Sequence, residues 1–99
     1  MFVRKDIPMA AQVVQTGHAC LEAGSRFPQP GKDTSYLVVL AVQNERKLME
    51  AVAEAKYHGV RSVVFFEPDN KLGHTASCTE PVQGETRHLF KRYPLWQPG

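Results

Sequence analysis

The chain has 99 residues, a length that predicts one domain spanning residues 1–99. Its apolar and charged fractions, 42% and 22%, are ordinary for a globular protein and exclude a disordered or fibrous chain. The net charge of +2 is too small to indicate a nucleic-acid partner by itself, and no apolar run is long enough to span a bilayer.

The two cysteines, Cys20 and Cys78, form no CxxC pair and no cluster with histidines at metal-ligand spacing. We interpret them as reduced thiols of a cytoplasmic protein, with a structural disulfide as the alternative. No motif indicates a metal or another cofactor, and no signal peptide is recognisable. The sequence therefore predicts a cytoplasmic protein without a cofactor and without a membrane partner, and it leaves a homodimer open.

The N-terminal part predicts a strand that turns into a helix. Residues 1–4 (MFVR) indicate a short apolar strand, and Asp6 can cap the helix that Pro8 favours in its first turn. We expect this helix over residues 9–24. Its predicted buried stripe consists of the apolar residues that recur at helical spacing, namely Met9, Val13, Val14, Cys20, Leu21 and Ala23.

A loop over residues 26–35 separates this helix from a second strand and a second helix. The continuous apolar run 36–42 (YLVVLAV) predicts a strand that is buried on both faces. Asn44 can cap a helix over 45–58, and Gly59 would end it. Leu48, Val52 and Ala55 would form the face of this helix that packs on the sheet.

The C-terminal half predicts a third strand over 60–66 and a turn-forming loop over 67–73. A weakly patterned fourth strand follows over 74–79, and we expect it at an edge of the sheet. A short helix over 83–92 and a proline-broken tail complete the chain.

These elements predict an α/β fold in three layers, α/β/α. The β-α-β-α-β order implies right-handed crossovers, and the short loop 67–73 makes the fourth strand antiparallel to the third. We therefore expect a four-stranded mixed sheet, with three parallel strands and one antiparallel, and helices on both faces. Five residues should be buried in adjacent parallel strands: Val38, Leu40, Val63, Val64 and Phe65.

Three short motifs then resemble the type 2 peptidyl-tRNA hydrolase family. The family's strand-to-helix turn R-x-D-L-x-M matches Arg4, Asp6, Ile7 and Met9. Its helix motif G-K-x-A-A-Q-x-x-H-A matches Gln15, His18 and Ala19, and its T-x-x-G-x-G-P segment lines up with residues 75–81. The resemblance covers nearly the whole chain and implies the same mixed four-stranded sheet.

The resemblance implies hydrolysis of the ester between a peptide and tRNA, and so a tRNA or peptidyl-tRNA partner. It implies a catalytic set of Glu67, Thr75, Asp6, Gln15 and His18. Glu67 stands where the family has an aspartate, and Ala11 stands where it has its functional lysine. With alanine at this position, the chain resembles a divergent branch of the family, the peptidyl-tRNA hydrolase domain-containing proteins.

Ester hydrolysis needs a group that deprotonates water and donors that stabilise the oxyanion. Glu67 could be the base, and the Thr75 hydroxyl could orient the water. Without the lysine, Lys5 or Lys71 would have to supply the cation, because loss of one oxyanion donor slows turnover by about 10²–10³-fold.

The remaining candidates each have a structural interpretation as well. His18 could be a packing histidine, and Glu67 a solvated loop residue. Five cations could bind RNA, although those near the C-terminus could equally form a solvated face: Lys5, Lys71, Arg87, Lys91 and Arg92. The alternative function is a catalytically silent module of the same fold that binds RNA or protein.

Overall fold

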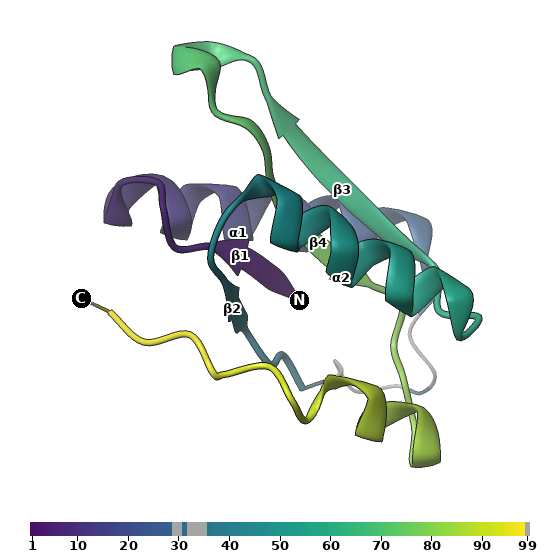
Figure 1. Ribbon diagram of the computed structural model, residues 1–99. Helices are drawn as coiled ribbons and strands as arrows, with labels where there is room; N and C mark the ends of the chain where they lie inside the picture. Colours follow the sequence, from purple (N-terminus) through teal and green to yellow (C-terminus); the bar gives the residue numbers. More distant parts are fainter. Residues whose placement is uncertain (29–30, 32–35, 99) are drawn as a thin grey trace.

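The computed structural model describes residues 1–28, 31 and 36–98, which form a four-stranded sheet with two long helices (Figure 1). The predicted order of elements is confirmed, with shifts of a few residues at their ends. The strands and long helices are β1 (Phe2–Arg4), α1 (Met9–Arg26), β2 (Leu40–Val42), α2 (Glu45–Tyr57), β3 (Ser62–Glu67) and β4 (Gly73–Thr79). Two short 3₁₀ helices, η1 (Asp69–Lys71) and η2 (Gly84–Phe90), follow β3 and β4. Of the loop predicted over 26–35, residues 29–30 and 32–35 lie outside the described residues.

The sheet has the strand order β2-β1-β4-β3. β1 and β2 are parallel, whereas β4 pairs antiparallel with both β1 and β3. β1, β2 and β3 thus run in the same direction, but the expectation that they form three paired parallel strands is wrong, because β4 is inserted between β1 and β3 and leaves only one parallel pair. The antiparallel pairing of the third and fourth strands is confirmed, but the fourth strand lies inside the sheet and not at its edge.

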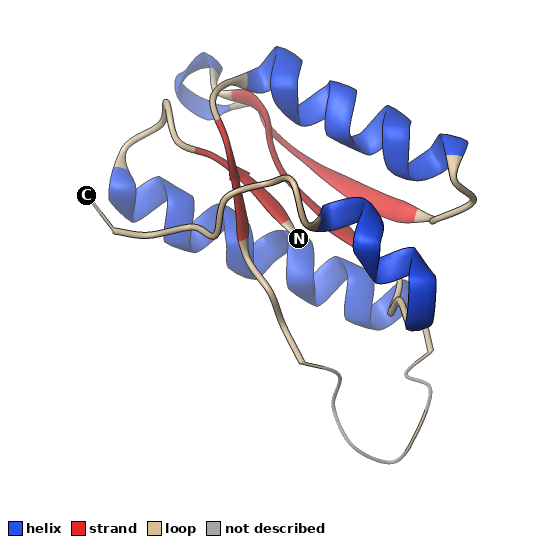
Figure 2. Ribbon diagram, turned by 60° about the horizontal axis from the view of Figure 1, so that its bottom comes forward, coloured by secondary structure: helices blue, strands red, loops and turns tan. Residues whose placement is uncertain are grey.

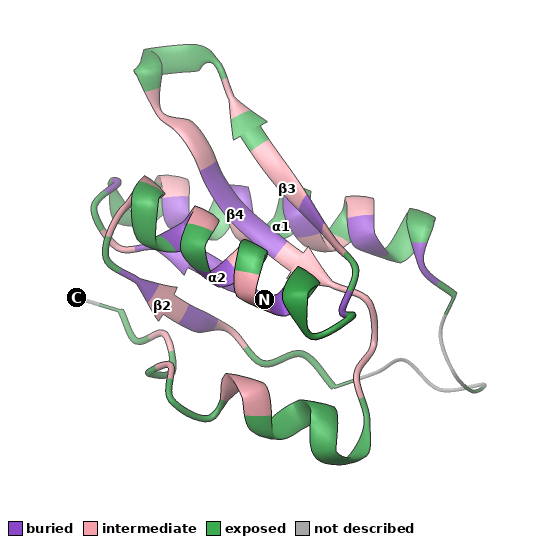
Figure 3. Ribbon diagram, turned by 45° about the vertical axis from the view of Figure 1, so that its right-hand side comes forward, coloured by how far each residue is buried: buried purple, intermediate pink, exposed green. Residues whose placement is uncertain are grey.

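β4 is a central strand without large apolar side chains, which is why its sequence resembles an edge strand. Thr75, Ala76 and Ser77 are nevertheless fully buried, and the middle of the strand is purple in Figure 3. The Ser77 hydroxyl donates a 2.8 Å hydrogen bond to the Val63 carbonyl, so this buried polar group has a hydrogen-bond partner. Small side chains with satisfied hydroxyls therefore allow both helices to approach this strand.

The two long helices pack on opposite faces of the sheet. Consecutive side chains of a strand point to opposite faces. Phe2 accordingly packs with Leu48 of α2, whereas Val3 packs with Ala19 of α1. Figure 2 shows the strands, in red, between these helices.

Of the predicted apolar stripe of α1, Ala23 is buried and Cys20 is half-buried, but the rest of the stripe is not. The buried residues are Gln12, Gln15, Ala19 and Ala23. The apolar residues Met9, Val13, Val14 and Leu21 are exposed, Leu21 by 76%. The prediction counted only apolar residues and left both glutamines out of the stripe, whereas both find hydrogen-bond partners inside. Gln12, for example, donates to the Ile7 carbonyl at 2.9 Å and accepts from the Trp96 indole at 2.6 Å.

The second strand is shorter than its apolar run. Only Leu40–Val42 pair with β1, and Val38 is 48% exposed. Of the other residues expected in the core, Leu40 and Val63 are buried, while Val64 and Phe65 are half-buried. On the outer edge of β2 the C-terminal tail takes the place of a further strand, through a bond from the Ala41 amide to the Pro94 carbonyl at 2.9 Å. This backbone contact covers the edge that β2 would otherwise expose.

Candidate active site

Gln15, Glu67 and Thr75 converge from α1, β3 and β4, and we call these three residues the Gln15 cluster. The Thr75 hydroxyl donates to Gln15 Oε1 at 3.2 Å, and Gln15 Nε2 donates to Glu67 Oε2 at 3.2 Å. The reverse orientation of the amide would place its oxygen against the carboxylate and is disfavoured by charge. The cluster is therefore a directed chain of hydrogen bonds that ends on Glu67.

A β-bulge in β4 brings Thr75 into this cluster. Phe65 pairs with Ala76 and Phe66 pairs with His74, so Thr75 is the extra residue of β4 at the shift in register. Because of the bulge, Thr75 and Ala76 both contact α1, although consecutive strand residues normally face opposite sides. Thr75 is fully buried. Its hydroxyl therefore orients Gln15 and has no path to solvent.

Glu67 is the ionised end of the cluster. Its Oε1 accepts the Asp69 N–H at 3.1 Å, while its Oε2 accepts the Gln15 amide. The Asp69 N–H most strongly, then the Gln15 amide and the nearby His18 ring, hold the pKa of Glu67 below its ordinary value. Each carboxylate oxygen has a second acceptor site, and the side chain is only partly buried. Glu67 can therefore accept a hydrogen bond from a water molecule.

His18 lies beside the cluster, one helical turn after Gln15. Its ring stacks on Phe65 with centroids 4.6 Å apart and planes 4° from parallel, and the residue is exposed. His18 thus packs on an aromatic side chain and also faces solvent near Glu67. The sequence alone did not indicate Phe65 as the platform for this ring.

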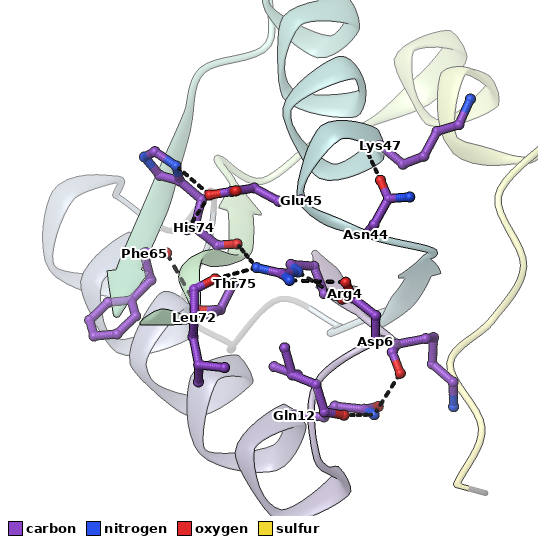
Figure 4. Close-up of polar contacts among 12 residues, drawn as sticks. Arg4, Asp6, Gln12, Asn44, Glu45, Lys47, Phe65, Leu72, His74 and Thr75 are labelled. Atoms are coloured by element: carbon purple, nitrogen blue, oxygen red, sulfur yellow. Dashed lines mark hydrogen bonds and ion pairs between the residues drawn. The ribbon is translucent and has the colours of Figure 1, made fainter. Parts of the chain in front are cut away.

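Asp6 is not part of the cluster, because the hydrogen bonds of its carboxylate among the described residues go to Arg4 and to none of Gln15, Glu67 and Thr75. It pairs with Arg4 through two bonds, from Nε at 2.8 Å and from Nη2 at 3.0 Å. Its predicted role as a cap is also wrong, since no side chain caps α1. Nη1 of the buried Arg4 donates to the carbonyls of Leu72 and His74 (Figure 4). Asp6 and Arg4 together hold the backbone that leads into Thr75.

The same backbone is held from the other side by α2. Glu45 Oε2 accepts the His74 N–H at 2.8 Å and lies 3.2 Å from His74 Nδ1. Gly73 adopts φ +75°, and a Cβ there would crowd the Glu45 carboxylate. The positive φ favours glycine at this position. Sequence reasoning missed both this contact and the structural role of Arg4, and only the conspicuous R-K-D turn gave a signal for the latter.

The five predicted RNA-binding cations do not gather at one place. Lys5 donates to the Gln97 carbonyl at 2.6 Å and lies over the Trp96 ring. Lys71 is exposed in η1, four residues after Glu67. η2, with the remaining cations near it, lies at the other end of the molecule from η1 in Figures 1 and 3. Of these, Arg92 pairs with Glu54, while Arg87 and Lys91 are exposed.

Ala11, at the position of the family's lysine, lies one turn before Gln15 on α1 and is half-buried. None of the hydrogen bonds and ion pairs among the described residues joins a lysine or arginine to the Gln15 cluster. Within residues 1–28, 31 and 36–98 no group of three or more His, Cys, Asp and Glu could hold a metal ion. The same part of the chain contains no helix that is both long and apolar enough to cross a membrane.

No protein-family model matches this chain, and no curated protein matches it.

Proposed function

We propose that this chain is a divergent hydrolase of the type 2 peptidyl-tRNA hydrolase kind, which releases peptides from tRNA in the cytoplasm. The observation that supports it is the Gln15 cluster. The family resemblance assigns its site to the positions of Gln15, Glu67 and Thr75, and these three positions share one chain of hydrogen bonds. The mixed four-stranded sheet and the helices on its two faces agree with the three-layer fold that the resemblance implies.

The proposed reaction begins with a water molecule bound to Glu67. Glu67 accepts a proton from this water, whose oxygen attacks the carbonyl carbon of the ester. The tetrahedral intermediate then expels the ribose oxygen, which takes a proton from His18 on the exposed side of the site. Glu67 then passes its proton to His18 through solvent, which restores both groups, and the new carboxyl group releases its proton to solvent. The products are a free peptide carboxylate and tRNA with its terminal hydroxyl restored.

The environment of Glu67 sets the expected speed. A lowered pKa keeps Glu67 ionised at neutral pH but makes it a weaker base. Ala11 supplies no cation for the oxyanion, and loss of such a donor typically costs a factor of about 10²–10³ in turnover. We therefore propose a slow enzyme, for which Lys71, four residues after Glu67 in the chain, is the candidate cation.

The test is single-turnover cleavage of an N-acetylated aminoacyl-tRNA. Glu67→Gln should lower the rate by about 10²-fold or more, because an amide cannot accept the proton. Glu85→Gln, which removes an exposed carboxylate from η2, is the matched control and should leave the rate unchanged. A wild-type rate equal to that of Glu67→Gln would contradict the proposed base.

The second function, a silent module that binds RNA or protein, is favoured by the missing cation. Ala11→Lys separates the two. In an enzyme limited by the missing charge, the substitution should raise the rate by about 10²-fold, and Glu67→Gln should abolish the gain. A variant that folds, binds tRNA and stays inert would favour the module. Circular dichroism of each variant is the necessary check on folding.

A further inference from the structure

A mainly apolar cavity that the candidate site does not use lies beside β2. Its volume is about 770 Å³, within the usual range of small-molecule sites of about 300–1,000 Å³. One wall is made by Tyr36, Leu37, Val38 and Leu40, and the others come from α1, from the end of β4 with the segment after it, and from η2 with the tail. Gln15, Glu67 and Thr75 do not line this cavity, so it is separate from the proposed hydrolytic site.

Apolar side chains that are not buried in the core line this cavity. Leu37 and Val38 are 58% and 48% exposed, although the sequence predicted them in a buried strand. Leu95, on the tail, is 63% exposed and lines the same space. Contiguous exposed apolar surface of this kind marks a binding site more often than a folding element. Its apolar walls fit the hydrocarbon part of a ligand.

The charge in the cavity is positive. Arg87 and Lys91 both line it, and neither has an ion-pair partner in the described part of the chain. The one lining carboxylate, Glu80, is already compensated by Arg61, whose Nη2 lies 3.2 Å from Oε1. Burial raises the pKa of the lining Cys78 thiol to about 11, so this thiol is neutral at pH 7. Arg87 and Lys91, which have no ion-pair partner among the described residues, therefore add positive charge to a cavity whose lining is mainly apolar.

We propose that this cavity binds an amphipathic monocarboxylate, with its hydrocarbon chain against Leu37, Val38 and Leu95 and its carboxylate between Arg87 and Lys91. An unbranched acyl chain matches the mainly apolar lining, in which the N-terminal ammonium of Met1 donates to the Val38 carbonyl at 3.0 Å. A carboxylate matches the cationic pair, because charge-assisted hydrogen bonds to guanidinium and ammonium groups are the strongest that these side chains make. The pair is thereby assigned a ligand other than RNA.

The test is isothermal titration of the whole chain with decanoate below its micelle concentration. Decanol and acetate serve as probes that lack the charge and the chain respectively. Decanoate should bind at one site, about tenfold more tightly than decanol, and acetate should not bind. Affinity should rise about fourfold for each methylene from hexanoate to decanoate, since each buried methylene contributes about 0.8 kcal/mol.

Variants then test each part of the site. The double substitution Arg87→Gln with Lys91→Gln should lower the affinity for decanoate about tenfold and leave the affinity for decanol unchanged. Arg46→Gln with Lys47→Gln removes the same charge from α2 and is the matched control, expected to bind like wild type. Leu37→Asp, at an exposed position that tolerates a polar residue, should also weaken decanoate.

Three results would overturn the proposal. The first is non-saturable binding, or binding at several equivalent sites. The second is equal affinity for decanol and decanoate. The third is displacement of decanoate by tRNA at concentrations that saturate tRNA binding, which would assign the cationic pair to RNA.

Discussion

Replacement of Thr75 by valine isolates the hydrogen bond on which the candidate site depends. Valine has nearly the shape of threonine, so packing is preserved while the hydroxyl is removed. Gln15 Oε1 then loses its donor in a residue that is only 4% exposed. An unsatisfied buried acceptor costs about 1–3 kcal/mol, so we expect Thr75→Val to lower the free energy of unfolding by about 2 kcal/mol.

Gln15→Met supplies the second arm of a double-mutant cycle. It should cost only about 1 kcal/mol, because the Thr75 hydroxyl keeps the Phe65 carbonyl as an acceptor at 3.4 Å and the partly exposed Glu67 can bind water instead. The double variant leaves no unpaired buried group, so it should be about 1–2 kcal/mol more stable than the sum of the single losses implies.

Urea unfolding followed by circular dichroism measures all four corners of this cycle. The slope of unfolding free energy against urea should stay constant, which shows that only stability has changed. Additive losses, within about 0.5 kcal/mol, would refute a directed bond from Thr75 to Gln15. They would also remove the physical reason for the orientation of Gln15 toward Glu67.

Three further predictions test the surroundings of the site. Arg4→Lys should lower the free energy of unfolding in urea by about 1–3 kcal/mol, because an ammonium group cannot bond to Asp6 and to the carbonyls of Leu72 and His74 at once. Stability equal to that of the wild type would contradict this role of Arg4. Val13→Gln with Leu21→Gln should change the free energy of unfolding by less than about 1 kcal/mol, because both side chains are exposed. A large loss would indicate that these residues are buried, as the sequence predicted. The lowered pKa of Glu67 stabilises the fold at pH values above the ordinary carboxyl pKa of 4.5, and this contribution disappears as the pH falls through the folded-state pKa. The free energy of unfolding should therefore fall less steeply with acidification in Glu67→Gln than in the wild type. An identical pH dependence would argue against the hydrogen bonds that Glu67 accepts.

Local rules account for the parts of the fold that the sequence predicted well. Asn44 was expected to cap α2, and its Oδ1 accepts the Lys47 N–H at 2.9 Å. Gly59 was expected to end this helix, and it adopts φ +81° just beyond the last helical turn. Both features depend only on residues a few positions apart, so they can be read from a single segment.

The parts that could not be predicted depend on distant partners. The sequence of β4 gives no sign that this strand inserts between β1 and β3, because small residues become central only where two helices cover them. The bulge at Thr75 depends on its pairing with β3. Burial of Gln12 depends on Trp96, 84 positions away. The resemblance indicated Gln15, Glu67 and Thr75 as site positions, but the order of their hydrogen bonds required the structure.

The most direct test of the proposed function follows the oxygen atom of the attacking water. An N-acetylated aminoacyl-tRNA is cleaved by the protein in water enriched in heavy oxygen, and mass spectrometry analyses both products. The proposal predicts that one solvent oxygen appears in the carboxyl group of the released acyl product, that the tRNA stays unlabelled, and that release falls to background in Glu67→Gln. Release by Glu67→Gln at the wild-type rate, or heavy oxygen in the terminal ribose of the tRNA, would contradict water attack directed by Glu67.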